Sequence, residues 1–268
     1  MHLHFTDPYR PRASPIHQLD PRVKFVLTVA FILATSLTPI GAWPVYVILL
    51  AIAVSAAILS DLGVGYVMKR SLLVSPFVLA ALPLLFTTAG TAIAVVPIGP
   101  WTLTATWQGL ERLISVLAKS WISVQMAILM TASTPFPQLL MAMRAVKVPQ
   151  LLVSTFGLMW RYLFVLVDEA GRLMRARASR SGNPGRPDAK TGGSVVWRAR
   201  VTGGMAGNLF LRSYERADHI YAAMVSRGYD GEARGFPLPR LSPAAWSVLA
   251  AGLGMLGALV GVGYWVWG

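Results

Sequence analysis

Long apolar runs separated by short polar connections dominate the chain. Five runs stand out, over residues 25–37, 43–59, 72–89, 110–130 and 246–267. Runs of this kind with few charges are typical of helices that cross a membrane, whereas a surface helix of a soluble protein carries a polar face along its whole length. The pattern therefore predicts an all-α integral membrane protein with about five transmembrane helices.

Local signals refine two of these runs. Asp20 can cap the first helix, and Pro21 suits the first helical position, where a backbone N–H is not needed. Pro76 and Pro83 lie inside the third run and should kink it, which neighbouring helices tolerate in a membrane. The uncharged stretch around 96–101 then connects the third run to the fourth.

Basic residues are distributed unevenly along the chain, and this predicts its orientation. Sixteen of the 24 Lys and Arg lie within residues 134–240. Basic connections stay on the cytoplasmic side of a membrane. We therefore expect a cytoplasmic arm over 1–24, a four-span bundle over 25–133, a cytoplasmic coupling-helix region over 134–240 and a last transmembrane helix over 241–268. The net charge of +13, distributed in this way, argues against nucleic acid as a partner.

The apolar stretch 151–167 is ambiguous. It contains Arg161 near its middle, and an arginine at the bilayer centre costs roughly 2.5–3.5 kcal/mol on insertion scales. A span here would also place about a dozen basic residues outside. We therefore predict a tilted or shallow helix packed under the bundle, and the alternative is a sixth span with residues 168–240 external.

Composition narrows the chemistry. The chain is 55% hydrophobic, 13% charged and free of cysteine, which excludes disulfides, thiolate metal sites and cysteine nucleophiles. Because no Gly-Lys-Ser/Thr phosphate loop is present, we expect no ATP binding and no cofactor in this chain. The first 24 residues lack the apolar stretch of a secretory signal, so no cleaved signal peptide is expected. His2 and His4 lie on this polar arm, and we interpret them as a solvated tail and not a metal site.

One charged residue lies near the middle of the fourth run. Lys119 is a candidate functional residue, because charges at such a depth are costly unless they serve a purpose. It could pair with Glu111, two helical turns earlier, face the interior of the bundle or extend to the membrane surface.

Two helical stretches in the basic region repeat one pattern. Residues 168–181 and 215–228 both read acid, one residue, Ala, two residues, Leu or Ile, two residues, Ala, two residues, Ser-Arg, and then Ser or Gly. At about 100° per residue, the Ala, Leu/Ile and Arg positions share one third of the helix surface. Each stretch is followed by glycines that stop a helix.

The repeat favours a docking role. A small residue on each side of an arginine leaves one long cationic side chain exposed at a helix end, where it can form a bidentate pair with a carboxylate in a groove of a partner. Two copies imply two equivalent grooves, as a partner with two similar subunits would supply. The alternative is that each arginine only complements the helix dipole, an effect of about 0.3–1 kcal/mol.

The chain resembles the transmembrane (T) component of energy-coupling-factor importers, the CbiQ/EcfT family. The resemblance covers nearly the whole length and is closest to the cobalt-system CbiQ branch at the N-terminus. It rests on residues 5–9 and 14–24, on Trp107-Gln108-Gly109-Leu110, on Trp160-Arg161-Tyr162-Leu163 with Asp168-Glu169, and on residues 212–217 and 223–231.

This resemblance implies a function and partners. A T component holds a substrate-binding membrane subunit, here CbiM-like, and docks on two ATP-binding-cassette ATPase subunits through two Ala-Arg-Xaa motifs at the ends of coupling helices. The matching positions are Ser179-Arg180-Ser181 and Ser226-Arg227-Gly228, supported by Leu173, Ala176, Ile220 and Ala223. Both copies have Ser where the family usually has Ala. Ala176-Arg177-Ala178 matches the motif literally but breaks the internal repeat.

The resemblance further implies a multi-pass protein of the bacterial plasma membrane, with a cytoplasmic N-terminus and no catalytic activity of its own. Cobalt is the implied substrate, with nickel as a possibility. Alternatives are the T component of a vitamin importer, a membrane-embedded lipid-modifying enzyme with a basic headgroup-facing loop, and a secondary transporter that works alone.

Overall fold

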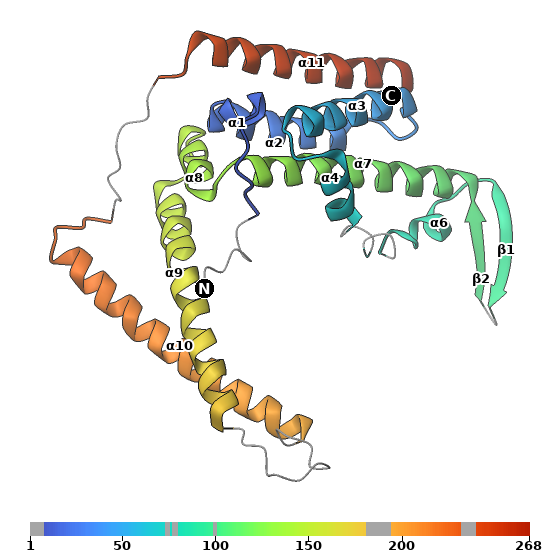
Figure 1. Ribbon diagram of the computed structural model, residues 1–268. Helices are drawn as coiled ribbons and strands as arrows, with labels where there is room; N and C mark the ends of the chain where they lie inside the picture. Colours follow the sequence, from blue (N-terminus) through green and yellow to red (C-terminus); the bar gives the residue numbers. More distant parts are fainter. Residues whose placement is uncertain (1–7, 73–75, 77–79, 99–100, 181–193, 232–239) are drawn as a thin grey trace. The chain divides into compact units, whose positions relative to one another are not determined.

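The computed structural model describes residues 8–72, 76, 80–98, 101–180, 194–231 and 240–268 (Figure 1). The described residues fall into two compact units. The first is formed by Met1–Val146 with Leu238–Gly268, and the second by Lys147–Pro237. Each unit has its own internal packing.

The first unit is a bundle of helices with one small hairpin of strands. Its elements are α1 (Pro15–Gln18), α2 (Pro21–Leu37), α3 (Trp43–Leu59), α4 (Val64–Ser71), α6 (Leu84–Thr87), β1 (Ala92–Ile98), β2 (Trp101–Thr106), α7 (Trp107–Ser133), α8 (Phe136–Ala145) and α11 (Pro243–Trp267). The second unit consists of α9 (Gln150–Arg180) and α10 (Val195–Val225).

The predicted class, an all-α membrane protein, is confirmed. Among the described residues, α7, α9 and α11 are long and apolar enough to cross a membrane, and α3 is a shorter apolar helix of 17 residues. A helix of that length extends about 25 Å, slightly less than the hydrocarbon core of a bilayer. The count of five spans and the boundaries at 134 and 240 stay predictions.

The start of α2 forms as its sequence predicts. The Asp20 side chain accepts a hydrogen bond from the backbone N–H of Arg22 at 2.9 Å, and Pro21 occupies the first turn. This cap satisfies one of the N–H groups that have no partner inside the helix.

The third apolar run does not form one continuous helix in its described part. Residues 73–75 and 77–79 lie outside the described residues, a turn interrupts the chain at Leu82 and Pro83, and α6 then covers only four residues. Pro83 therefore ends a helical segment where a kink was predicted, because its ring removes a backbone donor.

The connection after this run is a β-hairpin, which the sequence analysis did not predict. Strands β1 and β2 pair antiparallel, from Ala92 opposite Thr106 to Ile98 opposite Trp101. The second strand alternates Thr with apolar residues, a period-2 pattern typical of strands. This pattern is only six residues long and lies between two long apolar runs, so it was not recognised as a strand.

The core of the first unit lies where α2, α3, α7 and α11 meet. Phe31 of α2, Leu49 of α3, Ile122 of α7 and Leu256 of α11 are buried in one cluster. Close approach of α11 depends on Gly252, since a Cβ atom there would lie 2.6 Å from Cδ2 of Leu27. A second cluster, which includes Val67 and Leu129, joins α3, α4 and α7.

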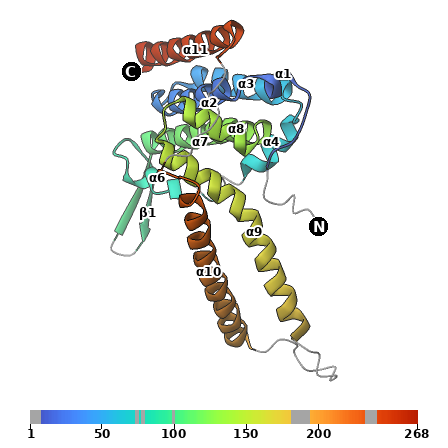
Figure 2. The same ribbon diagram turned by 90° about the vertical axis from the view of Figure 1, so that its left-hand side faces the viewer.

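The second unit is a pair of long antiparallel helices that cross each other (Figures 1 and 2). No residue of α9 or α10, both fully described, is buried. Helix α9 runs without interruption from the apolar stretch 151–167 into the first copy of the repeat. The prediction that 151–167 is tilted or shallow stays open, because α9 also has the length and hydropathy of a membrane-spanning helix.

Candidate coupling surface on the helix pair

The first copy of the repeat ends at the C-terminus of α9. Arg180 is the last residue of the helix, and both Ser179 and Arg180 are exposed. Ser181, the third residue of the predicted motif, lies outside the described residues. The hydroxyl of Ser179 donates to the backbone carbonyl of Ala176 at 2.9 Å.

The second copy ends at the C-terminus of α10. The N–H of Tyr229 donates to the carbonyl of Met224 at 3.0 Å, and the N–H of Gly228 donates to the carbonyl of Val225 at 2.9 Å. With Gly228 at φ +82, these bonds form a Schellman motif, in which a left-handed glycine closes the helix. Arg227 is therefore the final residue before the chain turns away, and it is exposed.

The two serines make the same local contact. Ser226 donates to the carbonyl of Ala223 at 3.0 Å, as Ser179 does to that of Ala176. Each hydroxyl bonds to its own helix, so each serine presents a small surface beside its arginine much as alanine would. This explains in physical terms how Ser can stand where the family usually has Ala.

The supporting residues of the two copies line separate grooves between α9 and α10. Leu173, Ala176 and Arg180 help to line a cavity of about 450 Å³, together with Trp197 of α10. Ile220 and Ala223 help to line another of about 440 Å³. Leu173 and Ile220 are half-buried, whereas the two alanines are exposed. Arg180 thus lines the first of these cavities, whereas the second lies beside Glu169 and Arg212 and does not include Arg227.

The two arginine ends lie far apart on the pair. Because Glu169 bonds to Arg212 and Arg177 to Thr202, Arg180 lies level with the part of α10 near residue 200. Arg227 lies 27 residues beyond that level, which corresponds to about 40 Å along a helix axis. An antiparallel pair necessarily places the C-termini of its two helices at opposite ends.

The helices are joined near their crossing by a charge network that the sequence analysis missed. The Glu169 carboxylate accepts a hydrogen bond from Arg212 of α10 at 2.8 Å and another from Arg172, one turn further along α9. Asp168-Glu169 and Arg212 were noted only as family positions, because no spacing rule pairs residues 43 positions apart. The network links the two helices at one register.

Reversing the charge of Glu169 should loosen this crossing. In Glu169→Arg, three arginines would face one another, so the helices should separate or slide. Spin labels at Ala178→Cys and Ala199→Cys, in a chain with no native cysteine, should report a longer and broader distance distribution by electron double resonance.

Adding Arg212→Glu to that variant should restore most of the original distribution, since opposite charges again face each other. Asp218→Arg serves as the control because Asp218 is an exposed acid on α10 that does not line the groove beside Glu169. An unchanged distribution in Glu169→Arg would show that apolar contacts alone hold the crossing.

Histidines and acids do not assemble into a metal site in the part of the chain that the structure describes. His17 instead contacts the hydroxyl of Ser14 at 2.7 Å and the carbonyl of Arg10 at 3.0 Å, which links α1 to the segment just before it. His219 is exposed on α10, and His2 and His4 lie outside the described residues.

A bundle of apolar helices joined in one chain to a separate long helix pair is typical of a multi-pass membrane protein with a two-helix unit of its own. Comparison with known families matches residues 12–237 to the CbiQ family, described as cobalt transport protein. The match covers most of the chain. The chain belongs to the CbiQ family.

Individual relatives agree with this assignment. The chain is 30% identical to the energy-coupling factor transporter transmembrane protein EcfT of Thermosediminibacter oceani, over 83% of each chain. It is 27% identical to a putative fused cobalt transport protein CbiMQ of Methanocorpusculum labreanum, over 91% of this chain and 40% of that protein. It is also 26% identical to the uncharacterized protein MJ1571 of Methanocaldococcus jannaschii, over 85% of this chain and 76% of the relative.

Proposed function

We propose that this chain is the coupling subunit of an ATP-driven importer, which transmits the motion of two ATP-binding-cassette ATPase subunits to a substrate-binding membrane subunit. The observation that carries the proposal is the pair of matched arginine ends, about 40 Å apart on one helix pair. The protein itself hydrolyses nothing in this scheme, and ATP hydrolysis takes place in the partners.

Each arginine end is suited to a groove lined by a carboxylate. The guanidinium is exposed at a helix terminus, a small serine precedes it, and the serine hydroxyl is already bonded to its own helix. The serine therefore brings no unpaired donor into a dry groove, and the arginine can form a charge-assisted, bidentate contact there. Two ATPase subunits of similar structure would offer two such grooves.

The helix pair is suited to transmit a change in the distance between the docking grooves of the two ATPase subunits. Each helix is 31 residues long and continuous. The side chains between the two helices are at most half-buried, so we expect a change in their crossing angle to cost less packing energy than a movement within the core of the first unit. When the ATPase subunits approach each other, we expect the arginine ends to follow and the crossing angle of α9 and α10 to change. A short described connection joins α9 to α8, which belongs to the first unit. We expect the motion to reach the helix bundle through this connection.

Cobalt is the substrate that we propose. The family description and the name of the fused relative both refer to cobalt transport, and the fusion favours a CbiM-like substrate-binding partner. Nickel is the alternative because it is chemically similar as a divalent ion and prefers similar ligands. We place the protein in the bacterial plasma membrane with its N-terminus and the helix pair on the cytoplasmic side, as the distribution of Lys and Arg favours.

Purification of the complex from native membranes tests the proposal. A tagged chain should retain two copies of ATP-binding-cassette subunits and one further polytopic membrane protein. Reconstituted in vesicles, this complex should take up cobalt only with ATP on the ATPase side, and nickel in competition tests its selectivity. Uptake by the isolated chain without ATP, or turnover of lipid by it, would contradict the proposal.

A further inference from the structure

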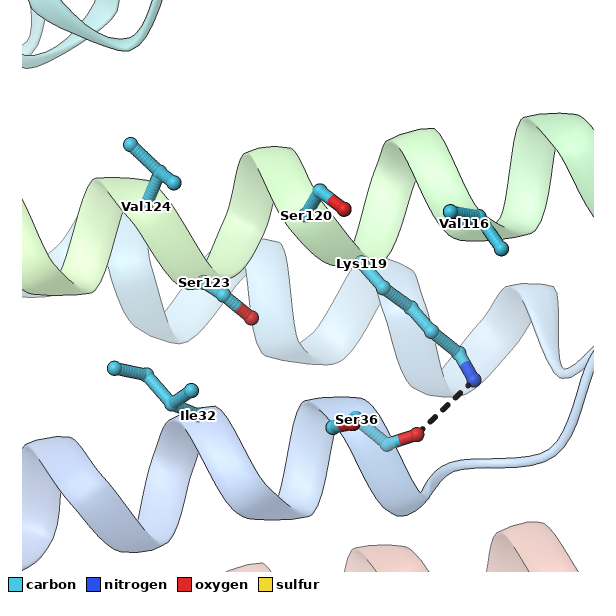
Figure 3. A pocket seen from close by; sticks show the side chains of 7 residues that line it. All are labelled: Ile32, Ser36, Val116, Lys119, Ser120, Ser123 and Val124. Atoms are coloured by element: carbon cyan, nitrogen blue, oxygen red, sulfur yellow. Dashed lines mark hydrogen bonds between the residues drawn. The ribbon is translucent and has the colours of Figure 1, made fainter. Parts of the chain in front are cut away.

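Two lysines mark the two ends of the antiparallel pair formed by α2 and α7. Lys24, near the start of α2, donates from Nζ to the carbonyl of Ser133, the last residue of α7, at 3.2 Å. At the other end, Lys119 of α7 donates to the carbonyl of Ser36 at 3.3 Å and to that of Thr38 (Figure 3). The end at Lys24 adjoins the N-terminal arm, which we place on the cytoplasmic side, so the end at Lys119 lies towards the outer side.

The N-terminal arm and α4 meet at the end that holds Lys24, which we call the basic end. The backbone N–H of Arg10 donates to the carbonyl of Ala132, one residue before the end of α7, at 2.9 Å. Val67 of α4 is buried in the same cluster as Ala132. Because two segments far apart in the sequence are held against the last turn of α7, their side chains come together there.

Two arginines from these segments converge on Tyr66 of α4. The guanidinium carbon of Arg10 lies 3.9 Å from the centroid of the Tyr66 ring, and that of Arg70 lies 5.9 Å from it. Arg70 also donates from Nη1 to the Tyr66 hydroxyl at 2.7 Å. Both arginines are exposed, and within the described residues neither forms an ion pair with a carboxylate. Two positive charges this close together repel each other, so an anion that contacts both is favoured.

The outward side of α4 combines cations with apolar side chains. Val67 faces the bundle and is buried, whereas Met68 and Leu72 are exposed. Lys69 and Arg70 are exposed on the same short helix. A helix surface of this composition is typical of a membrane surface, where apolar side chains enter the acyl region and cations meet anionic headgroups. This favours a phospholipid over a soluble phosphate compound as the source of the anion.

We infer that Arg10, Tyr66 and Arg70 form a binding site for the phosphate of an anionic phospholipid in the leaflet at the basic end of the bundle. The two guanidiniums donate charge-assisted hydrogen bonds to the phosphate oxygens, and the Tyr66 ring holds both guanidiniums in place. The cationic group of a zwitterionic lipid would be repelled by the arginines and Lys69, so the site selects lipids with a net negative charge. The site includes neither arginine end of the helix pair, so it does not depend on the proposed function.

Quenching of a fluorophore beside the site by spin-labelled lipids tests the inference. Gly65 directly precedes Tyr66 and is exposed, and a Cβ atom there would meet no neighbour within 4 Å. Because the chain has no cysteine, Gly65→Cys can carry a bimane label in the full chain, reconstituted in phosphatidylcholine vesicles. The quenchers are phosphatidylglycerol and phosphatidylcholine, each with a doxyl group at the same acyl position near the headgroup. We expect phosphatidylglycerol to quench at a several-fold lower mole fraction than phosphatidylcholine.

Variants of the two arginines, made in the labelled chain, test which residues cause this preference. Arg10→Gln/Arg70→Gln should raise the mole fraction of phosphatidylglycerol needed by about tenfold, the effect expected for two basic residues at a membrane surface. Arg112→Gln/Arg175→Gln is the matched control, because it removes the same charge at exposed positions outside the site. It should leave the preference unchanged. Arg10→Lys/Arg70→Lys keeps the charge and should retain most of the preference.

Three results would overturn the inference. The first is equal quenching by the two lipids in the parent chain, or a preference for phosphatidylglycerol that survives in Arg10→Gln/Arg70→Gln. The second is relief of quenching by inorganic phosphate beyond that caused by sodium chloride of the same ionic strength, because the anion would then be a soluble one. The third is loss of the preference in the lysine variant as well, because the arginines would then serve to hold the arm and not a headgroup. None of these results bears on ATPase binding, so the proposed function would stand.

Discussion

Replacement of both arginines, in Arg180→Glu/Arg227→Glu, should release the chain from its ATPase subunits while the chain still inserts in the membrane. Each arginine end is expected to pair with a carboxylate, and a glutamate there would meet a like charge in a desolvated groove. Truncation of one partner of a buried charge pair costs about 2–5 kcal/mol, and reversal costs more, so the two losses together should remove measurable binding.

Co-purification of the ATPase subunits with the membrane-inserted chain is the readout. Each single variant should weaken binding by a similar amount, because the two copies of the repeat have matched neighbours and the same serine-to-carbonyl bond. Arg175→Glu is the control: Arg175 is an exposed arginine of α9 outside the repeated positions. A double variant that keeps its ATPase subunits and full uptake would count heavily against docking through these ends.

Replacement of Gly228 by valine should disable the second end alone. Gly228 adopts φ +82 in the Schellman motif, and a β-branched residue in that region is strained by about 1–3 kcal/mol. The helix should relieve the strain by ending differently, which would move Arg227 out of position. We expect weaker ATPase binding with nearly unchanged helix content by circular dichroism.

Gly228→Asn is the matched control, because asparagine tolerates the left-handed region far better than valine. It should retain most of the binding that Gly228→Val loses. Full binding by both variants would mean that the left-handed glycine is not needed for docking, and equal loss would mean that any side chain at this position obstructs the groove.

The repeated pattern allowed both arginine ends to be predicted from sequence, because helical periodicity fixes which positions share a face. Periodicity could not predict that Ser179 and Ser226 turn their hydroxyls back on Ala176 and Ala223. It also could not predict the separation of the ends, since that depends on the register of α9 against α10. That register involves tertiary contacts such as the pair of Glu169 with Arg212, which helical periodicity does not encode.

The first unit, the helix bundle, was likewise predicted only in part. Long apolar runs predicted α3, α7 and α11, and the cap at Asp20 was confirmed. The β-hairpin was missed, because its short polar alternation lies between long apolar runs, and Pro83, which was predicted to kink a helix, interrupts it instead. For Lys119 the sequence offered three surroundings, and the structure places its ammonium on the carbonyls that end α2, which lie 81 and 83 residues away in the chain.

Cross-linking from both ends of the helix pair at once tests the central claim most directly. Ser179→Cys and Ser226→Cys lie beside the two arginines and leave them in place, in a chain that has no other cysteine. With a short bifunctional reagent in the intact complex, each single variant should join one ATPase subunit. The double variant should yield one chain joined to two ATPase copies. If both cysteines reacted only with reagent applied from outside the cell, or if neither joined an ATPase subunit in an active complex, the account would be contradicted.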